Sequence, residues 1–203
     1  MGEKMKHQRK LSIEHIYNLV KPFSKLGEKL SENKSYLIGN PYKDKPYYWL
    51  ITIFSPITEK ELQILREVLY IPDIYATFLT DCCNGLDLFL GTLSLFGYRK
   101  NMKRIPSEAI QQPFNIVTTN IHERPKNSKN EYFFFGYYNW DGSLVYINTI
   151  DNSVCLCKKD DATPLHTWNT FESFLETEIK RICSLFNEHG EEKEPNRSTL
   201  PIG

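Results

Sequence analysis

The sequence has no surplus of positive or negative charge and no long uninterrupted apolar segment. Lysine plus arginine number 25 and aspartate plus glutamate number 25, so the formal net charge is zero. Nucleic-acid binding normally requires a basic surplus, so this balance argues against direct contact with nucleic acid. The charged N-terminus is not followed by an apolar run of signal-peptide or membrane-spanning length. We therefore expect a cytoplasmic protein without a membrane partner.

The cysteine pattern corresponds neither to a disulfide framework nor to a metal site. The five cysteines are Cys82, Cys83, Cys155, Cys157 and Cys183. An odd number at these spacings favours reduced thiols. Cys155 and Cys157 point to one face of an expected strand and would supply half of a zinc site, but structural zinc sites prefer Cys-x-x-Cys spacing and four ligands. We favour structural thiols and predict no metal and no cofactor.

No group of residues indicates catalysis. The sequence contains no glycine-rich phosphate-binding loop. A cysteine or serine nucleophile needs a histidine that a third group orients. The histidines lie in segments without a catalytic motif: His7, His15, His122, His166 and His189. We therefore predict a protein that is not an enzyme and has no catalytic residues.

What the sequence does contain suits one α+β domain. A chain of 203 residues can bury a sizeable core, and its 12 tyrosines and 12 phenylalanines favour a β-rich one. We expect this domain over residues 11–186, in which residues 11–56 form an N-terminal extension plus a strand. Residues 1–10 are expected to form a flexible N-terminal tail. Residues 187–203 carry too little apolar content to offset the entropy of ordering, which predicts a flexible C-terminal tail.

The spacing of apolar residues predicts the order of helices and strands. Ser12 caps a first helix, Thr58 and Glu61 form a capping box for a helix over residues 59–69, and a final amphipathic helix begins near Asn169. Strands are predicted at residues 36–38, 47–54, 114–121, 131–138, 142–148 and 153–157. Three of these strands have the spacing of a meander.

The segment from Ile71 to Gly85 contains the signals of a complete helix. A proline suits the first helical turn, where its missing N–H would have no partner. An Asn-Gly pair tolerates the left-handed conformation that ends a helix. Apolar residues share one face between these two signals. The residues to which we assign structural roles are Pro72, Tyr75, Phe78, Leu79, Asn84 and Gly85.

This segment resembles the signature of the SUKH superfamily, whose members include bacterial immunity proteins and fungal cell-wall-synthesis regulators. In that signature a Leu/Ile-Pro-x-x-Tyr-x-x-Phe-Leu helix ends in Asn-Gly. The order of the following parts continues the similarity over residues 57–186, through an Asn-Trp-Asp-Gly turn and a final helix. The resemblance implies a mixed or mainly antiparallel twisted sheet that helices pack on one side.

The resemblance also implies a function in binding another protein. The first interpretation is a non-enzymatic immunity protein that neutralises a cognate toxin, commonly a nuclease in this superfamily. The alternative is a scaffold or regulator of signalling or cell-wall synthesis. Candidate partner-binding residues, expected at one edge of the sheet with Trp168, are Trp140, Asp141, Asp151, Asp160 and Asp161. A structural role stays open for them, because aspartates initiate turns and tryptophans fill cores.

Overall fold

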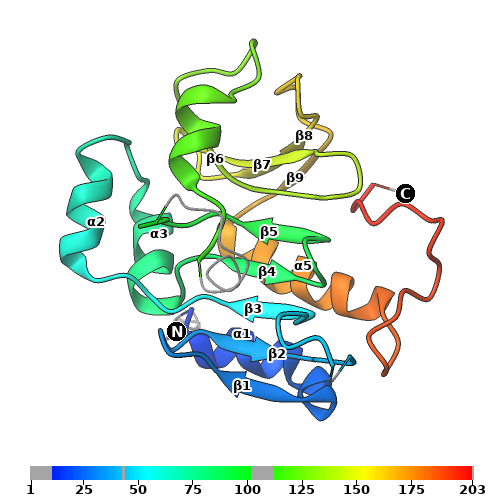
Figure 1. Ribbon diagram of the computed structural model, residues 1–203. Helices are drawn as coiled ribbons and strands as arrows, with labels where there is room; N and C mark the ends of the chain where they lie inside the picture. Colours follow the sequence, from blue (N-terminus) through cyan, green and yellow to red (C-terminus); the bar gives the residue numbers. More distant parts are fainter. Residues whose placement is uncertain (1–10, 43, 102–111, 203) are drawn as a thin grey trace, which may run out of the picture.

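The computed structural model describes residues 11–42, 44–101 and 112–202, so the tail predicted at residues 1–10 lies outside the described residues. The described residues form a twisted antiparallel sheet with helices against one face (Figure 1). The predicted α+β class, with a mainly antiparallel sheet, is confirmed. No helix in this part of the chain combines the length and the apolar character that crossing a bilayer requires.

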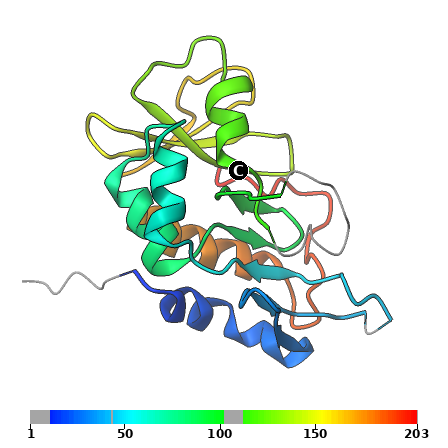
Figure 2. The ribbon, with the colours of Figure 1, turned by 60° about the vertical axis from the view of Figure 1, so that its left-hand side comes forward.

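Nine strands in the described residues follow one another across the sheet in chain order, each antiparallel to the next. They are β1 (Glu28–Leu30), β2 (Tyr36–Ile38), β3 (Ile51–Ile53), β4 (Leu86–Leu88), β5 (Leu93–Leu95), β6 (Tyr132–Tyr137), β7 (Leu144–Asn148), β8 (Val154–Cys157) and β9 (His166–Trp168). Figure 2 shows β1–β3 in the lower part of the molecule and β6–β9 in the upper part, joined through β4 and β5. The predicted meander is present as β6–β8.

The helical elements gather mainly on one face of this sheet. They are α1 (Ile13–Val20), the 3₁₀ turn η1 (Lys21–Leu26), α2 (Glu59–Arg66), α3 (Asp73–Thr77), the π-helical turns η2 (Phe78–Cys82) and η3 (Thr118–His122), and α5 (Phe171–Leu185). Helices α1 and α5 lie behind β1–β5 in Figure 1, and α2 and α3 lie beside them. The main hydrophobic core fills the space between these helices and the sheet.

Side-chain caps fix where three helices begin. The Ser12 hydroxyl accepts a hydrogen bond from the His15 N–H at 3.3 Å and starts α1. At α2, the Glu61 N–H donates to the Thr58 hydroxyl at 3.3 Å, and the Thr58 N–H donates to the Glu61 carboxylate at 2.8 Å. This reciprocal pair is the predicted capping box. Helix α5 is capped by Thr170, one residue after the predicted Asn169.

Tyr75 occupies the centre of the main core. Its side chain is fully buried, and its hydroxyl donates a hydrogen bond to the Phe96 carbonyl at 2.5 Å. Its ring centroid lies 5.2–5.5 Å from the rings of four phenylalanines: Phe78, Phe133, Phe135 and Phe171. The tyrosine therefore joins α3, the sheet and α5.

The Asn84-Gly85 pair connects the end of the helix to the sheet. The Asn84 side chain accepts from the Tyr98 N–H at 2.7 Å and donates to the Tyr98 carbonyl at 2.9 Å. Gly85 has a φ of +96°, and a Cβ at this position would lie 2.6 Å from the Leu95 carbonyl oxygen. Cys83, in extended backbone conformation, is the residue that ends η2. The positive φ and the close approach of the Leu95 backbone both favour glycine at position 85.

The strand predicted at residues 114–121 is wrong, because this segment forms a short helical stretch that ends in η3. Its β-branched residues favour a strand locally, but Ile116, Thr119 and Asn120 are buried at helical spacing. The Asn120 side chain donates to the Phe134 carbonyl at 2.6 Å and accepts from the Phe134 N–H at 2.9 Å. The Asn120 side chain therefore satisfies the backbone N–H and carbonyl of Phe134 in β6. These groups lie next to an irregularity in the pairing of β6 with β7.

Cys155 and Cys157 lie in a second, smaller core on the opposite face of β6–β8, with Phe134 and Tyr146. The Cys155 sulfur is 3.7 Å from the Thr167 hydroxyl. Burial raises the pKa of Cys157 to about 12, so its thiol stays protonated at neutral pH. Both sulfurs contribute to packing in this arrangement.

Residues 187–202 fold back against the end of α5, although the sequence predicts a flexible tail there. The Lys193 N–H donates to the Leu185 carbonyl at 2.9 Å, and the Asn187 N–H donates to the Glu191 carbonyl at 2.9 Å. Thr199 is buried. Backbone hydrogen bonds hold this segment against α5. A prediction based on apolar content does not detect such contacts, because they need no apolar side chains.

Candidate functional site

An open groove of about 1060 Å³ lies at one end of the sheet, which we call the sheet-end groove. Most of its lining comes from residues 41–42 and 48–50 between β2 and β3, residues 89–92 between β4 and β5, residues 139–140 between β6 and β7, and residues 186–199 after α5. Figure 1 shows these connections and the C-terminal segment together at the right-hand end of the molecule. The antiparallel meander brings the three strand connections to the same end, since they join alternate strand pairs.

Buried apolar side chains form the floor of the sheet-end groove. Phe89 and Phe186 stack with their centroids 3.8 Å apart and an interplanar angle of 7°. Leu50 is buried beside them, and a Cβ on Gly190 would lie 2.2 Å from its Cδ1 atom. The C-terminal segment therefore approaches the floor as closely as a glycine allows.

The connection between β4 and β5 holds two bulky residues in the left-handed backbone region. Phe89 has a φ of +46° and Leu90 a φ of +57°. Residues other than glycine in this region cost free energy and persist only where the surroundings fix them. Here Phe89 is fixed by the Phe186 stack, and Leu90 is left 42% exposed at the groove.

Exposed aromatic rings form part of the rim. Trp140 is 46% exposed and Tyr42 is 45% exposed. Tyr42 packs edge-on against Tyr48 with a centroid distance of 4.9 Å. Large apolar side chains that gather beside a groove at the surface are typical of protein-binding sites.

The charge of the groove is negative in the residues described. Its lining contains the carboxylates of Glu191 and Glu192 and the imidazole of His189, and no lysine or arginine among the described lining residues. The Lys45 ammonium lies over the Tyr42 ring, 4.9 Å from its centroid, and 5.8 Å from the centroid of Tyr48. A cation thus already lies on the rings of Tyr42 and Tyr48, which we call the aromatic wall.

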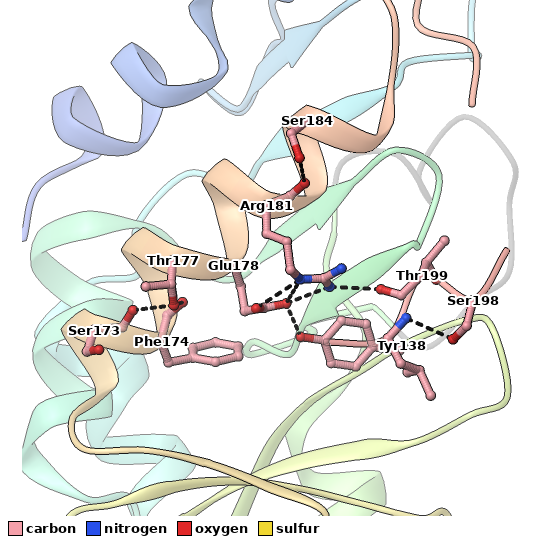
Figure 3. A network of polar contacts seen from close by, with 10 residues as sticks. Tyr138, Ser173, Phe174, Thr177, Glu178, Arg181, Ser184, Ser198 and Thr199 are labelled. Carbon is pink, nitrogen blue, oxygen red and sulfur yellow. Dashed lines mark hydrogen bonds and ion pairs between the residues drawn. The ribbon is translucent and has the colours of Figure 1, made fainter. Parts of the chain in front are cut away.

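A buried polar network holds the C-terminal segment in place (Figure 3). The Tyr138 hydroxyl donates to Glu178 at 2.6 Å, and the Arg181 Nη2 donates to the same carboxylate at 2.7 Å. Arg181 Nη2 also donates to the Thr199 carbonyl at 2.8 Å. Burial, with the nearby Glu178 carboxylate, raises the pKa of Tyr138 well above its ordinary value. Because Thr199 lines the groove, this network links α5 to the groove wall.

The structure brings only some of the predicted partner-binding residues to one end of the sheet. Trp140 lines the sheet-end groove and Asp141 follows it, with a carboxylate that accepts from the Ser143 N–H at 2.9 Å. Asp151 lies at the other end of β7, so the expectation of one shared edge is wrong for it. Hydrogen bonds from Ser153 lower the pKa of Asp151, which indicates a turn-forming role.

Asp160 and Asp161 lie in the connection between β8 and β9, which leaves the sheet at the same end as the turn with Trp140 and Asp141, but neither is among the described lining residues of the groove. Asp160 is exposed. Asp161 accepts from the Thr163 N–H at 2.9 Å and from the Asn127 side chain at 2.7 Å, and these hydrogen bonds lower its pKa to about 2. Trp168 is buried with its ring 5.0 Å from that of Phe174. Asp161 thus fastens a loop, and Trp168 fills the core.

The sequence reasoning missed most of the groove. Tyr42, Leu90, Phe186 and Glu192 come from three segments that only the fold brings together. One local signal was available for Tyr42, because it is an aromatic residue in a turn-rich segment with no strand to bury it. The other three have no such signal.

One comparison with known proteins gives a match. The model of the SMI1 / KNR4 family (SUKH-1) matches residues 56–177, which is more than half of the chain. The chain belongs to the SUKH-1 family. No curated protein and no solved structure matches it.

Only part of the lining of the sheet-end groove lies within the residues of this SUKH-1 protein that match the family model. Leu90 and Trp140 lie inside the matched region, residues 56–177. Tyr42 and the C-terminal segment with Glu191 lie outside it. One side of the groove thus belongs to the SUKH-1 region, and the flanking segments complete it.

Within the part of this SUKH-1 protein that the structure describes, the carboxylate of Asp87 has a strongly raised pKa. Burial raises the pKa of Asp87, on β4, from 3.8 to about 6, although the Ser94 hydroxyl donates to it at 2.8 Å and opposes the shift. The neutral form of Asp87 therefore stabilises the fold below about pH 4, and this contribution is lost as pH rises through about 6.

Asp87→Asn is expected to stabilise the protein at pH 7, by up to roughly 3 kcal/mol, because the amide carries no charge to desolvate. The gain should shrink as the pH falls through about 4 and disappear below about pH 3, where Asp87 is protonated in both the folded and the unfolded chain. Urea unfolding of both proteins across this pH range measures the difference. Asp160→Asn, at an exposed position, serves as the control. A stability difference that does not change with pH would show that the pKa of Asp87 is not raised in the folded protein.

Proposed function

We propose that this SUKH-1 protein is a non-enzymatic immunity protein, which binds a cognate toxin in the cytoplasm of the producing cell and blocks it. The observation that carries the proposal is the sheet-end groove, with its buried aromatic floor and its exposed Trp140. Neutralisation by binding needs only a rigid complementary surface. Membership of a family within a superfamily that includes immunity proteins supports the same conclusion.

Rigidity favours the groove as the docking surface. The floor is fixed by the Phe89–Phe186 stack, and the C-terminal wall is fixed by Arg181 through the Thr199 carbonyl. A surface that is ordered before binding loses less conformational entropy when the partner docks. A stable complex with a toxin would bury about 1,600 Å² in total, so contacts must extend beyond the groove onto the neighbouring turns.

Trp140→Ala is expected to abolish or greatly reduce protection when the protein is co-expressed with the toxin encoded beside it. A central tryptophan in an interface typically contributes 2 kcal/mol or more, which corresponds to about a thirtyfold loss of affinity. Tyr70→Ala, at a residue that is 70% exposed on another segment, is the matched control. Survival and co-purification of the two chains are the measurements.

Full protection by Trp140→Ala, or the absence of any complex with the adjacent gene product, would contradict the proposal. The alternative function is a scaffold or regulator of signalling or cell-wall synthesis. Co-purification of such a protein in place of a toxin, with no effect on toxin sensitivity, would favour that alternative.

A further inference from the structure

We infer that the sheet-end groove binds an arginine side chain from a loop of the partner protein, which stacks on the aromatic rim and pairs with the carboxylates of the C-terminal wall. The inference rests on the proposed function, because it names the chemistry of the partner at that site. Three observations carry it: the charge of the lining, the aromatic rim and the cation already seated there.

The first observation is charge complementarity. Glu191 and Glu192 are the lining residues with carboxylates, and Asp141 follows Trp140 at the rim. The protein as a whole has no net charge, so this negative character is local to the groove. Two lysines lie nearby without lining the groove: Lys159 packs along Gly142, 3.3 Å from where a Cβ would lie, and Lys45 lies over the Tyr42 ring. A positively charged partner group is therefore favoured in the groove itself.

The second observation is the shape of the groove. Trp140 and Tyr42 each expose close to half of their surface beside the groove, where a planar cation could stack on an aromatic ring. The apolar floor of Phe89 and Phe186 suits the three methylenes of an arginine side chain. A guanidinium is planar, weakly hydrated and able to stack and to pair with a carboxylate at the same time, which a lysine ammonium cannot do as well.

The third observation is Lys45, which already places a cation over the rings of Tyr42 and Tyr48. This internal contact shows that the aromatic wall holds a positive group in the absence of a partner. Lys45 is exposed, so its contact with the rings is weak, and an arginine that also pairs with Glu192 would have more interactions available. Lys45 therefore competes with the partner for the aromatic wall.

The test uses the full chain and a synthetic peptide of three Gly-Leu-Arg repeats, with matched peptides in which arginine is replaced by citrulline, lysine or glutamate. Citrulline keeps the shape of arginine and removes the charge. We expect the arginine peptide to bind about tenfold more tightly than the citrulline peptide. The indole N–H resonance of Trp140 should shift in NMR spectra, and the affinity should fall as salt is added.

Variants then separate the site from the rest of the surface. Glu191→Gln with Glu192→Gln should remove the preference for arginine over citrulline, whereas Glu188→Gln, on the same segment but outside this groove, should leave it unchanged. Lys45→Met should raise the affinity for the arginine peptide severalfold, because it vacates the aromatic wall.

Equal binding of the arginine and citrulline peptides, no binding of the arginine peptide at millimolar concentration, or an unchanged preference in the double glutamine variant would overturn the inference. The results also distinguish a failure of the proposed function from a failure of the arginine assignment. If Trp140 is needed for toxin binding but the double glutamine variant binds as well as the parent, the function stands and the arginine assignment is wrong. If the peptides show the preference but no toxin is neutralised, the assignment stands and the function is wrong.

Discussion

Tyr75→Ala is expected to lower the free energy of unfolding by about 4 kcal/mol, because it removes a buried aromatic ring and leaves a cavity. The ring contacts four phenylalanines from η2, β6 and α5, so no single neighbour can move to fill the space. The Phe96 carbonyl would also lose the hydroxyl donor at 2.5 Å. Since domains of this size are stable by only about 5–15 kcal/mol, the variant should be close to unfolded at 37 °C.

Urea unfolding followed by circular dichroism measures this change. Tyr75→Phe, which keeps the ring and removes only the hydroxyl, should cost about 1–2 kcal/mol. Tyr70→Ala, at a residue 70% exposed to solvent, should change stability by no more than about 0.5 kcal/mol. A similar loss at positions 70 and 75 would show that Tyr75 is not the centre of the core.

Arg181→Met is expected to cost about 3–5 kcal/mol, because it leaves the Glu178 carboxylate buried without its cation. Glu178 is 2% exposed, and Arg181 bonds both of its oxygens as well as the Thr199 carbonyl. Loss of the last bond should also release the C-terminal wall of the sheet-end groove. Chemical denaturation gives the energy, and amide hydrogen exchange at residues 187–202 reports the release.

A triple variant tests whether the loss comes from the unpaired charge. Arg181→Met combined with Glu178→Leu and Tyr138→Phe replaces the whole network by apolar groups of similar size, and such replacements are often neutral for stability. We expect the triple variant to recover most of the lost stability and to retain fast exchange in residues 187–202. If it is as unstable as Arg181→Met alone, the cost comes from packing and not from the buried charge.

Local signals in the sequence predicted much of the fold. The Thr58 capping box, the proline-headed helix with Tyr75 and the meander of β6–β8 all depend on neighbours a few residues away, so their patterns can be read from the chain. The same reasoning failed at residues 114–121, because the Asn120 side chain makes hydrogen bonds to the Phe134 backbone, fourteen positions along the chain. No local preference encodes that contact.

The candidate site was harder to predict for a similar reason. Trp140 was identified as an aromatic residue beside the carboxylates of nearby turns, with a role in the core left open, but its exposed position at a groove depends on segments distant in the sequence. Asp151 and Asp161 looked equally suitable, and only their hydrogen bonds to nearby groups distinguish turn formation from partner binding. The polar C-terminal segment, with Glu191 and Glu192, gave no sign that it forms a wall.

The consecutive order of the nine strands has a consequence for synthesis of the chain. Each described strand pairs with the strand that precedes it, so a nascent chain leaving the ribosome can add hairpin after hairpin without waiting for a distant segment. Helix α5 is the exception, since it covers part of the core and is made after all nine described strands. Until residues 171–185 have been made, the part of the apolar face that α5 covers stays open, and we expect chains truncated before residue 171 to aggregate or to be held by chaperones.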